Sequence, residues 1–353
     1  MARSVLSAKK PSDAKFDILK LVMSFFVVAI HMALLPEILY PWLRMAVPLF
    51  FIMTGFFFFK KLDRISDYAQ QKNAVKDFVL RNLKLYAFWT ILFLPYIVYI
   101  RRDVYFGHET VFGDIFAIIR AVLFSGTFTA SWYIVASIYG ALIIFFLLRK
   151  LPNSVLFVIA IVLYAIASLT SAYEVTIFKS DVVKTAYDIF CTYIEVPATS
   201  FLTAVAWMIC GKCFAQGMFR GTKTVYIVLS VVSAVALYAE WLFVRHLDST
   251  INNDCYLMLM PFCIGVFGWI NYCGKLNLKY AINIRRCSTI VFVTHGVVAR
   301  TIVISFRKVL HIEATLLCYM LVIAVCICIY LFVEWLHNKC EDKWLGRILR
   351  YAF

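Results

Sequence analysis

The stretch DILKLVMSFFVVAIH (residues 17–31) has the apolar character of a membrane span, yet it contains a lysine and a histidine. Lys20 and His31 are eleven positions apart. Eleven residues at about 100° each turn a helix about 20° past three full turns, so both side chains share one face, about 16 Å apart along the axis. Asp17 lies near the same stripe. Ionisable residues inside a membrane are costly and normally face the bundle interior. The stretch therefore predicts a polar face that crosses most of a bilayer.

The composition of the whole chain resembles that of this stretch. Of the 353 residues, 63% are hydrophobic and 16% are charged, whereas a soluble domain is about half apolar and about a quarter charged. Apolar runs approach the length of a helical span several times. We therefore predict an all-α integral membrane protein, with residues 1–353 forming a single domain and no soluble domain. The chain is expected to form ten spans, at residues 17–35, 42–59, 82–100, 131–148, 154–171, 197–214, 224–244, 256–271, 287–306 and 314–336.

The positive charge of the chain, formally +15, is distributed unevenly between the predicted loops. With the N-terminus in the cytoplasm, the inner segments hold 24 Lys and Arg residues and the outer segments hold nine. This bias towards the inside predicts that both termini are cytoplasmic. The basic residues then face anionic lipid of the inner leaflet, and no nucleic-acid partner is needed to explain them.

A second polar stripe occurs in the predicted ninth span, CSTIVFVTHGVVARTIVISF (residues 287–306). Ser288 and His295 are seven positions apart, about 20° short of two turns, so they also share a face. Simpler interpretations remain open for these residues. In one, His295 is hydrogen-bonded in a helix contact without a chemical role, and His31 is an ordinary interfacial histidine. In another, Lys20 reaches the inner surface and pairs with Asp17.

A metal site is not expected. The segment Cys210-Gly-Lys-Cys213 has the spacing of a metal-binding or redox pair. It stands alone at a helix end without a second pair, so it is interpreted as helix packing.

Several of these motifs resemble one known family. Asp17-Ile-Leu-Lys20, followed by ten residues and His31, is similar to the first-helix motif of membrane-bound acyltransferase family 3, with Lys in place of the family's Arg. The segment RMAVPLFFIMTG (residues 44–55) resembles the second-helix motif, which begins with an Arg and ends in Ser-Gly. Ser131-Trp132-Tyr133-Ile134 is similar to a middle-span element, and the Ser288–His295 pair to a late one. Ten helices also match the family architecture.

The resemblance implies a membrane O-acyltransferase. Such proteins move an acyl group, usually acetyl from cytosolic acetyl-coenzyme A, to a hydroxyl of a cell-surface or exported carbohydrate. The acyl-coenzyme A is a donor substrate, and no permanently bound cofactor is expected. The chain is expected in a cell membrane, typically the bacterial inner membrane, acting alone or with separate polysaccharide-synthesis proteins.

The resemblance and the residue chemistry together suggest roles. A neutral imidazole suits the removal of a proton from a sugar hydroxyl, so His31 is assigned as general base, with His295 as its partner. Arg44 is expected to stabilise negative charge on the reacting oxygen or to bind an anionic acceptor, and its simpler interpretation is an interfacial anchor. The substrate-binding candidates are Lys20, Asp17, Trp132, Tyr133 and Ser288. Among them, Lys20 would hold the donor, although lysine lacks the planar two-pronged contact of arginine with phosphate.

Two other classes of protein remain possible on the sequence alone. One is a transporter or flippase for a glycan or metabolite, which should show two related halves with Gly- or Pro-broken spans. No convincing internal repeat is visible. The other is a non-catalytic membrane component of a polysaccharide-synthesis machine.

Overall fold

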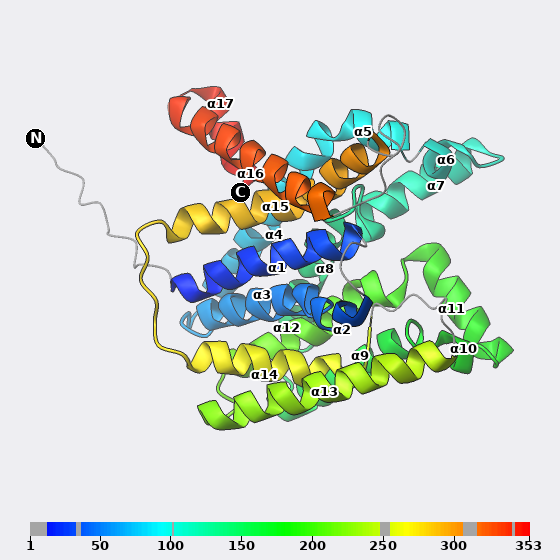
Figure 1. The fold of residues 1–353 in the computed structure, drawn as a ribbon, viewed down its shortest axis with the longest axis vertical. Coiled ribbons are helices and arrows are strands. Elements are labelled where there is room, and N and C mark those ends of the chain that lie inside the picture. Colours follow the sequence, from blue (N-terminus) through cyan, green and yellow to red (C-terminus); the bar gives the residue numbers. More distant parts are fainter. Residues whose placement is uncertain (1–12, 33–36, 101, 248–254, 306–315, 341–342) are drawn as a thin grey trace, which may run out of the picture.

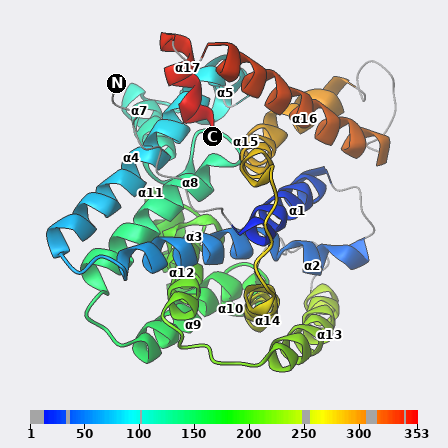
Figure 2. The same ribbon diagram turned by 90° about the vertical axis from the view of Figure 1, so that its left-hand side faces the viewer.

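The computed structural model describes residues 13–32, 37–100, 102–247, 255–305, 316–340 and 343–353, and no β-strand occurs among them. The longer helices lie side by side in one bundle (Figures 1 and 2). They are α1 (Ala14–Met32), α3 (Ala46–Leu62), α4 (Tyr68–Leu92), α8 (Ser131–Leu142), α9 (Asn153–Leu169), α12 (Phe201–Ala215), α13 (Lys223–Leu247), α14 (Leu259–Tyr272), α15 (Ala281–Ser305) and α16 (Leu316–Lys339). The shorter ones are α2 (Tyr40–Leu43), α5 (Leu94–Ile100), α6 (Arg102–Phe106), α7 (Val111–Arg120), α10 (Glu174–Ile177), α11 (Asp181–Tyr193) and α17 (Trp344–Leu349).

Helix α12 forms the most buried part of the bundle, packed against α3, α8 and α9. Two glycines allow α12 and α3 to approach closely. A Cβ atom on Gly211 of α12 would lie 2.2 Å from the carbonyl oxygen of Ile52, and one on Gly55 of α3 would lie 2.4 Å from that of Met208. Small residues at such crossings bring helix backbones together in membrane proteins. This close contact with α3 therefore fixes the position of α12 in the core of the bundle.

Helix α1 lies between α3 and α15 and packs against both. Its apolar residues Phe16, Met23 and Val27 are buried, and so is the carboxylate-bearing Asp17. By contrast, α13 and α16 expose many of their large apolar side chains, as helices that face lipid do. Asp17 of the polar face of α1 is thus directed into the bundle, as the sequence predicts.

Each predicted span overlaps a helical segment over the part that the structure describes, whereas residues 33–35, 306 and 314–315 of these spans lie outside the described residues. By length and composition, five described helical segments are able to cross a membrane, or six if the bent pair α4–α5 counts as one span. Three further apolar helices are shorter: Ser131–Leu147, Asn153–Leu169 and Leu259–Tyr272. Helix α1 carries three charged residues, Lys15, Asp17 and Lys20, so its composition alone does not mark it as a span.

The predicted span at residues 82–100 differs most from the structure. Helix α4 begins at Tyr68, capped by the Asp67 carboxylate, which accepts a hydrogen bond from the Gln70 amide at 2.9 Å. Because its first turns are polar, a search for apolar runs does not detect them. At the other end, the chain bends by 66° between α4 and α5. Pro95 stands at this bend and has no N–H to donate to the preceding turn, which explains the break.

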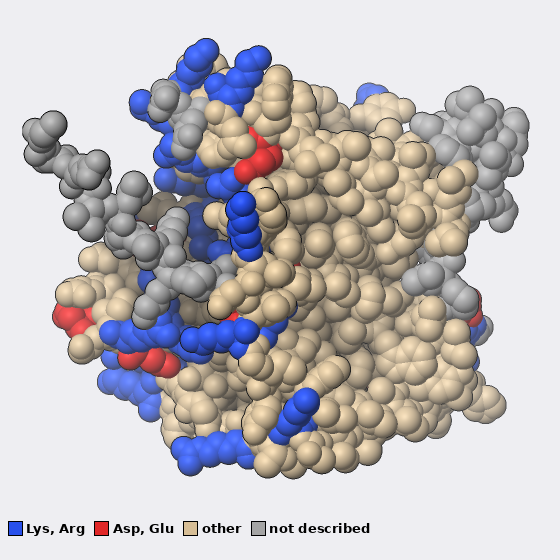
Figure 3. Space-filling view, turned by 60° about the vertical axis from the view of Figure 1, so that its left-hand side comes forward, with Lys and Arg blue, Asp and Glu red and all other residues tan. Residues whose placement is uncertain are grey.

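Basic side chains gather at the end of the bundle where α1 begins (Figure 3). Exposed lysines and arginines at this end come from the end of α3, from α4 and from the segment between α14 and α15, and include Lys60, Arg64, Lys72, Lys76 and Lys275. The flank of the bundle in the same view is almost free of charged side chains (Figure 3). We call this end the basic end.

Candidate functional site

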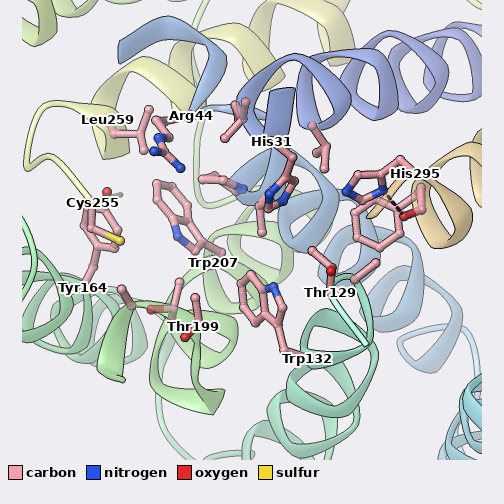
Figure 4. A pocket seen from close by; sticks show the side chains of 18 residues that line it. His31, Arg44, Thr129, Trp132, Tyr164, Thr199, Trp207, Cys255, Leu259 and His295 are labelled. Atoms are coloured by element: carbon pink, nitrogen blue, oxygen red, sulfur yellow. Dashed lines mark hydrogen bonds between the residues drawn. The ribbon is translucent and has the colours of Figure 1, made fainter. Parts of the chain in front are cut away.

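A cavity of about 130 Å³ lies at the end of α1 opposite the basic end, and we call it the outer cavity (Figure 4). Side chains from α1, α3, α8, α9, α12, α14 and α15 contribute to its wall, together with the segments that precede α3, α8, α12 and α14. The polar and aromatic side chains in this wall are His31, Arg44, Thr129, Trp132, Tyr164, Thr199, Thr203, Trp207, Cys255, Phe292 and His295.

The outer cavity brings together the two histidines that the sequence singled out. The imidazole rings of His31 and His295 have centroids 5.1 Å apart and planes inclined by 33°. His31 is exposed at the end of α1, whereas His295 is fully buried in α15. One histidine is thus open to the surroundings of the cavity, and the other is shielded behind it.

The tautomer of His295 follows from its hydrogen bond. Its Nδ1 lies 2.6 Å from the carbonyl oxygen of Phe292, one turn earlier in α15. A carbonyl oxygen only accepts, so Nδ1 carries the proton and Nε2 of the neutral ring carries a lone pair. Nε2 is buried and has no hydrogen-bond partner among the described residues. His295 therefore presents a proton acceptor beside His31.

Arg44 and Trp132 lie in the same cavity wall as the histidines (Figure 4). Arg44 follows α2, and α2 is anchored by Trp42, whose indole nitrogen donates to the Ala234 carbonyl of α13 at 3.1 Å. Trp132 is in the first turn of α8. Its neighbour Ser131 stabilises the start of α8, because its hydroxyl accepts a 2.9 Å hydrogen bond from the Phe128 amide. A cation and a flat aromatic ring thus border the histidine pair.

The segment before α14 completes the wall of the outer cavity, and Glu240 of α13 holds this segment in place. Its carboxylate accepts hydrogen bonds of 2.7 Å each from the amides of Leu257 and Met258 and from the Tyr173 hydroxyl. Burial and the hydrogen bond to Glu240 raise the pKa of Tyr173, which keeps it a neutral donor. These contacts position Leu259 at the cavity.

A second cavity, of about 510 Å³, lies at the basic end, and we call it the inner cavity. Residues of α1, α3, α4 and α15 form most of its wall. Its charged residues are Lys20, Lys61, Arg81, Arg285, Asp13, Asp17 and Asp77.

The charges of the inner cavity are partly paired. Arg285 donates two hydrogen bonds to the carboxylate of Asp17, at 2.8 and 3.1 Å, and Lys15 forms an ion pair with Asp13 at 3.3 Å. Lys20 and Arg81 instead lie over aromatic rings, and no salt bridge to either occurs among the described residues. The cavity therefore offers cations to an anionic ligand.

Aromatic rings separate the two cavities. Tyr133 packs against Phe51 and Phe292, with ring centroids 4.4 and 5.3 Å apart. Its hydroxyl forms a 2.8 Å hydrogen bond with that of Thr54, which lines the inner cavity, while Phe292 lines the outer one. Phe50 packs against both Tyr133 and Phe292. We call Phe50, Phe51, Tyr133 and Phe292 the aromatic partition.

The structure divides the candidate residues from the sequence into four groups. His31, His295, Arg44 and Trp132 meet at the outer cavity, and Lys20 and Asp17 meet at the inner one. Tyr133 belongs to the aromatic partition and not to the wall of the outer cavity. Ser288 is buried on α15, two turns from His295 towards the basic end, and lies outside the lining of both cavities. The pairing considered between Asp17 and Lys20 is replaced by the one between Asp17 and Arg285.

Sequence reasoning missed other site residues. Arg81 and Arg285 were counted only among the basic residues of the inner segments, although a carboxylate predicted inside a span calls for a cationic partner. Trp207 lies in the apolar segment FLTAVAWMICGKCFA (residues 201–215), which has no polar stripe to draw attention to it. No group of three His, Cys, Asp or Glu residues suited to a metal ion occurs in the described ranges.

The chain is similar in sequence to a known family and to several curated proteins. A family model described as an acyltransferase domain matches residues 13–333 of the chain. Two proteins of Enterococcus faecalis, each described as an amino-acid racemase, are 24% identical. One matches over 264 residues, 72% of this chain and 35% of the relative. The other matches over 324 residues, 88% of this chain and 44% of the relative.

A serine/alanine racemase of Enterococcus gallinarum is 30% identical over 158 residues, which is 42% of this chain and 22% of that protein. The chain thus spans less than half the length of the curated relatives it matches. No solved structure matches the chain.

Proposed function

This chain belongs to acyltransferase family 3, whose model matches residues 13–333, and we propose that it moves an acyl group across the membrane. The donor would be a cytosolic acyl-coenzyme A, in the simplest case acetyl-coenzyme A, and the acceptor a carbohydrate hydroxyl on the other side. The observation that carries the proposal is that α1 presents Lys20 to the inner cavity and His31 to the outer cavity. One helix therefore links a cationic site to a histidine pair.

The inner cavity supports the donor part of the proposal. Coenzyme A carries several phosphate charges, and the cations of this cavity suit phosphates. Arg81 provides a planar fork for two-point contact, and Lys20 provides a compact charge. The pantetheine arm of the donor is long and thin, so it is the part that would pass the aromatic partition to bring the thioester to the histidines.

The outer cavity supports the transfer itself. The acceptor hydroxyl oxygen attacks the thioester carbonyl, a carbon–oxygen bond forms, and the carbon–sulfur bond breaks. His31, with His295 as its partner, takes the hydroxyl proton and returns a proton to the leaving thiolate. General base catalysis of this kind typically raises the reaction rate about 10²–10⁴-fold. Arg44 stabilises the negative charge that develops on the carbonyl oxygen. Trp132 offers its ring to one face of a sugar.

The proposed orientation places the basic end in the cytosol. Ten crossings, with both termini cytosolic, would put the inner cavity next to the donor supply and the outer cavity next to exported acceptors. The gathering of lysine and arginine at one end of the bundle supports this orientation. The protein would work in a cell membrane, surrounded by lipid, alone or together with other polysaccharide-synthesis proteins.

A second candidate function is the passage of a small polar metabolite through the bundle. Two observations favour it: the cavities lie at opposite ends of α1, and the relatives are described as racemases of amino acids. In that case the inner cations and outer histidines would hold the two charged groups of an amino acid in turn.

Reconstitution in vesicles separates the two candidates. Radiolabelled acetyl-coenzyme A is supplied on the side of the basic end, and methyl glucoside and cyclohexanediol are supplied on the other side. Labelled ester on the alcohol supports acyl transfer. Uptake of labelled L-serine that needs no acetyl-coenzyme A, with no ester formed, would instead support passage of a metabolite.

A further inference from the structure

Trp207 brings an indole N–H to the wall of the outer cavity, and this donor has no hydrogen-bond acceptor among the described residues. The Trp207 side chain is fully buried, with 0% of it exposed. An indole nitrogen only donates, and buried polar groups in folded proteins are nearly always hydrogen-bonded. The donor therefore calls for an acceptor inside the cavity, either water or a ligand that displaces the water.

The neighbours of Trp207 keep its ring in one place. The edge of Tyr164 packs against it, with ring centroids 4.7 Å apart and planes inclined by 64°. Tyr164 is itself anchored, because its hydroxyl donates to the Tyr256 carbonyl at 2.7 Å. The close contact of Gly211 with α3 fixes the helix that carries Trp207. The indole N–H is thus a preorganised donor.

The same cavity contains an unsatisfied acceptor on another helix. Nε2 of His295 carries a lone pair, is buried, and has no hydrogen-bond partner in the described part of the chain. Figure 4 shows the two histidines and Trp207 entering the cavity from different elements. One water needs about 10–15 Å³ of such space, so the cavity holds roughly ten water-sized groups, about the size of one hexose ring. A single ring therefore matches the cavity in volume.

We propose that Trp207 selects acceptors that carry a second oxygen. The ligand would be one ring with at least two oxygen functions. One is the hydroxyl that reacts at the His31–His295 pair, and the other accepts a hydrogen bond from Trp207 Nε1. This inference rests on the proposed acyl transfer and makes it specific for polyols over simple alcohols. The second oxygen changes no bond during the reaction, so Trp207 is a specificity residue and not a proton carrier.

The test uses the purified, reconstituted chain with radiolabelled acetyl-coenzyme A and four alcohols: cyclohexanol and its 1,2-, 1,3- and 1,4-diols. Trp207→Phe keeps the aromatic ring and removes the N–H. The measured quantity is the preference for diols, the ratio of kcat/KM for the best diol to kcat/KM for cyclohexanol. We expect Trp207→Phe to lower this ratio about three- to tenfold, the loss of one neutral hydrogen bond. Trp335→Phe, the same change at an exposed position of α16, should leave the ratio unchanged.

A binding measurement makes the test independent of turnover. In protein labelled with ¹⁵N-tryptophan, the indole N–H signal that disappears in Trp207→Phe belongs to Trp207. At least one diol should shift this signal, whereas cyclohexanol should not. A preference for diols that survives in Trp207→Phe, or a signal that no diol moves, overturns the proposal. A shift by diols in a parent protein that transfers no acetyl supports the role of Trp207 in binding and contradicts the acyltransferase function.

Discussion

The carboxylate of Asp17 and the guanidinium of Arg285 are joined by two hydrogen bonds, of 2.8 and 3.1 Å, across the contact between α1 and α15. The Asp17 side chain is 3% exposed and that of Arg285 is 45% exposed. Because His31 and His295 lie farther along the same two helices, this ion pair fixes how the helices are aligned. The pair at the inner cavity therefore positions the histidines at the outer one.

The two members of the ion pair are not equivalent. Arg285→Met removes two donors from a buried carboxylate, and we expect it to lower the free energy of unfolding by about 1–3 kcal/mol. Asp17→Asn should cost less, because the half-exposed guanidinium of Arg285 remains in contact with water. Thermal unfolding in detergent measures both variants. Equal losses, or a larger loss in Asp17→Asn, would contradict this ordering.

The histidine pair is expected to be essential for transfer but not for folding. His31→Gln and His295→Gln should each lower the rate of ester formation by about 10²–10⁴-fold, the usual size of general base catalysis. His246→Gln, on the exposed end of α13, provides a matched control. Initial rates with radiolabelled acetyl-coenzyme A measure the effect. Near-normal transfer by a stable His31→Gln protein would remove His31 from the mechanism.

Lys20 is expected to hold the donor through its charge. Lys20→Met keeps the length of the side chain and removes the charge, and should weaken coenzyme A binding by about 1.5–3 kcal/mol, the range for a charge-assisted hydrogen bond. Lys20→Arg should retain the affinity or increase it, because arginine contacts phosphate with two N–H groups. Calorimetry with coenzyme A gives the affinities, and Lys279→Met, an exposed lysine outside the inner cavity, is the control. If Lys20→Met binds like the parent, Lys20 serves only as an inner-surface anchor.

The contact between α3 and α12 predicts a loss of stability without a change in chemistry. Gly211→Ala would bring a Cβ atom to 2.2 Å from the Ile52 carbonyl oxygen, and such overpacking costs about 1–3 kcal/mol. Gly274→Ala adds the same methyl group where no atom lies within 4 Å. Thermal unfolding should show a lower midpoint for the first variant only. A midpoint unchanged by Gly211→Ala would mean that the helices separate easily at this crossing.

Topology is tested with a pair of introduced cysteines. Glu109→Cys, before α7, and Lys72→Cys, in the first half of α4, both replace exposed residues. In intact cells, an impermeant maleimide should add label to Glu109→Cys but not to Lys72→Cys, relative to the parent chain. Opening the membrane should make both accessible. The reverse pattern in intact cells would invert the orientation and with it the assignment of inner and outer cavities.

The helices and the polar face of α1 were accessible from the sequence because both depend on local periodicity. Helical geometry alone places Lys20 and His31 on one face, and the structure shows this face directed into two cavities. The bend after α4 was missed because the apolar run continues through Pro95 without a change in hydropathy. A search that treats proline as a helix breaker would have found it.

The parts of the site that depend on helix packing were not predictable. Nothing in the local sequence around Arg285 indicates that it meets Asp17, because the contact depends on how α1 and α15 pack. Trp207 looks like any other apolar residue of α12 until the structure shows which side of the helix faces the cavity. Tyr133 and Trp132 are adjacent in sequence, so they point in different directions on α8, and only the structure decides which one meets the cavity.

The aromatic partition has a consequence for the ion gradients across the membrane. A water-filled passage between the cavities would let protons and sodium ions run down their gradients and would discharge the membrane. Four packed rings, with the Tyr133 hydroxyl hydrogen-bonded to Thr54, form a mainly apolar layer between the cavities in the described part of the chain. Crossing these rings would cost a hydrated ion its water shell, whereas a slender uncharged chain of atoms would only need to displace the rings. The partition would thus let the bundle transfer an acyl group while the membrane remains impermeable to ions.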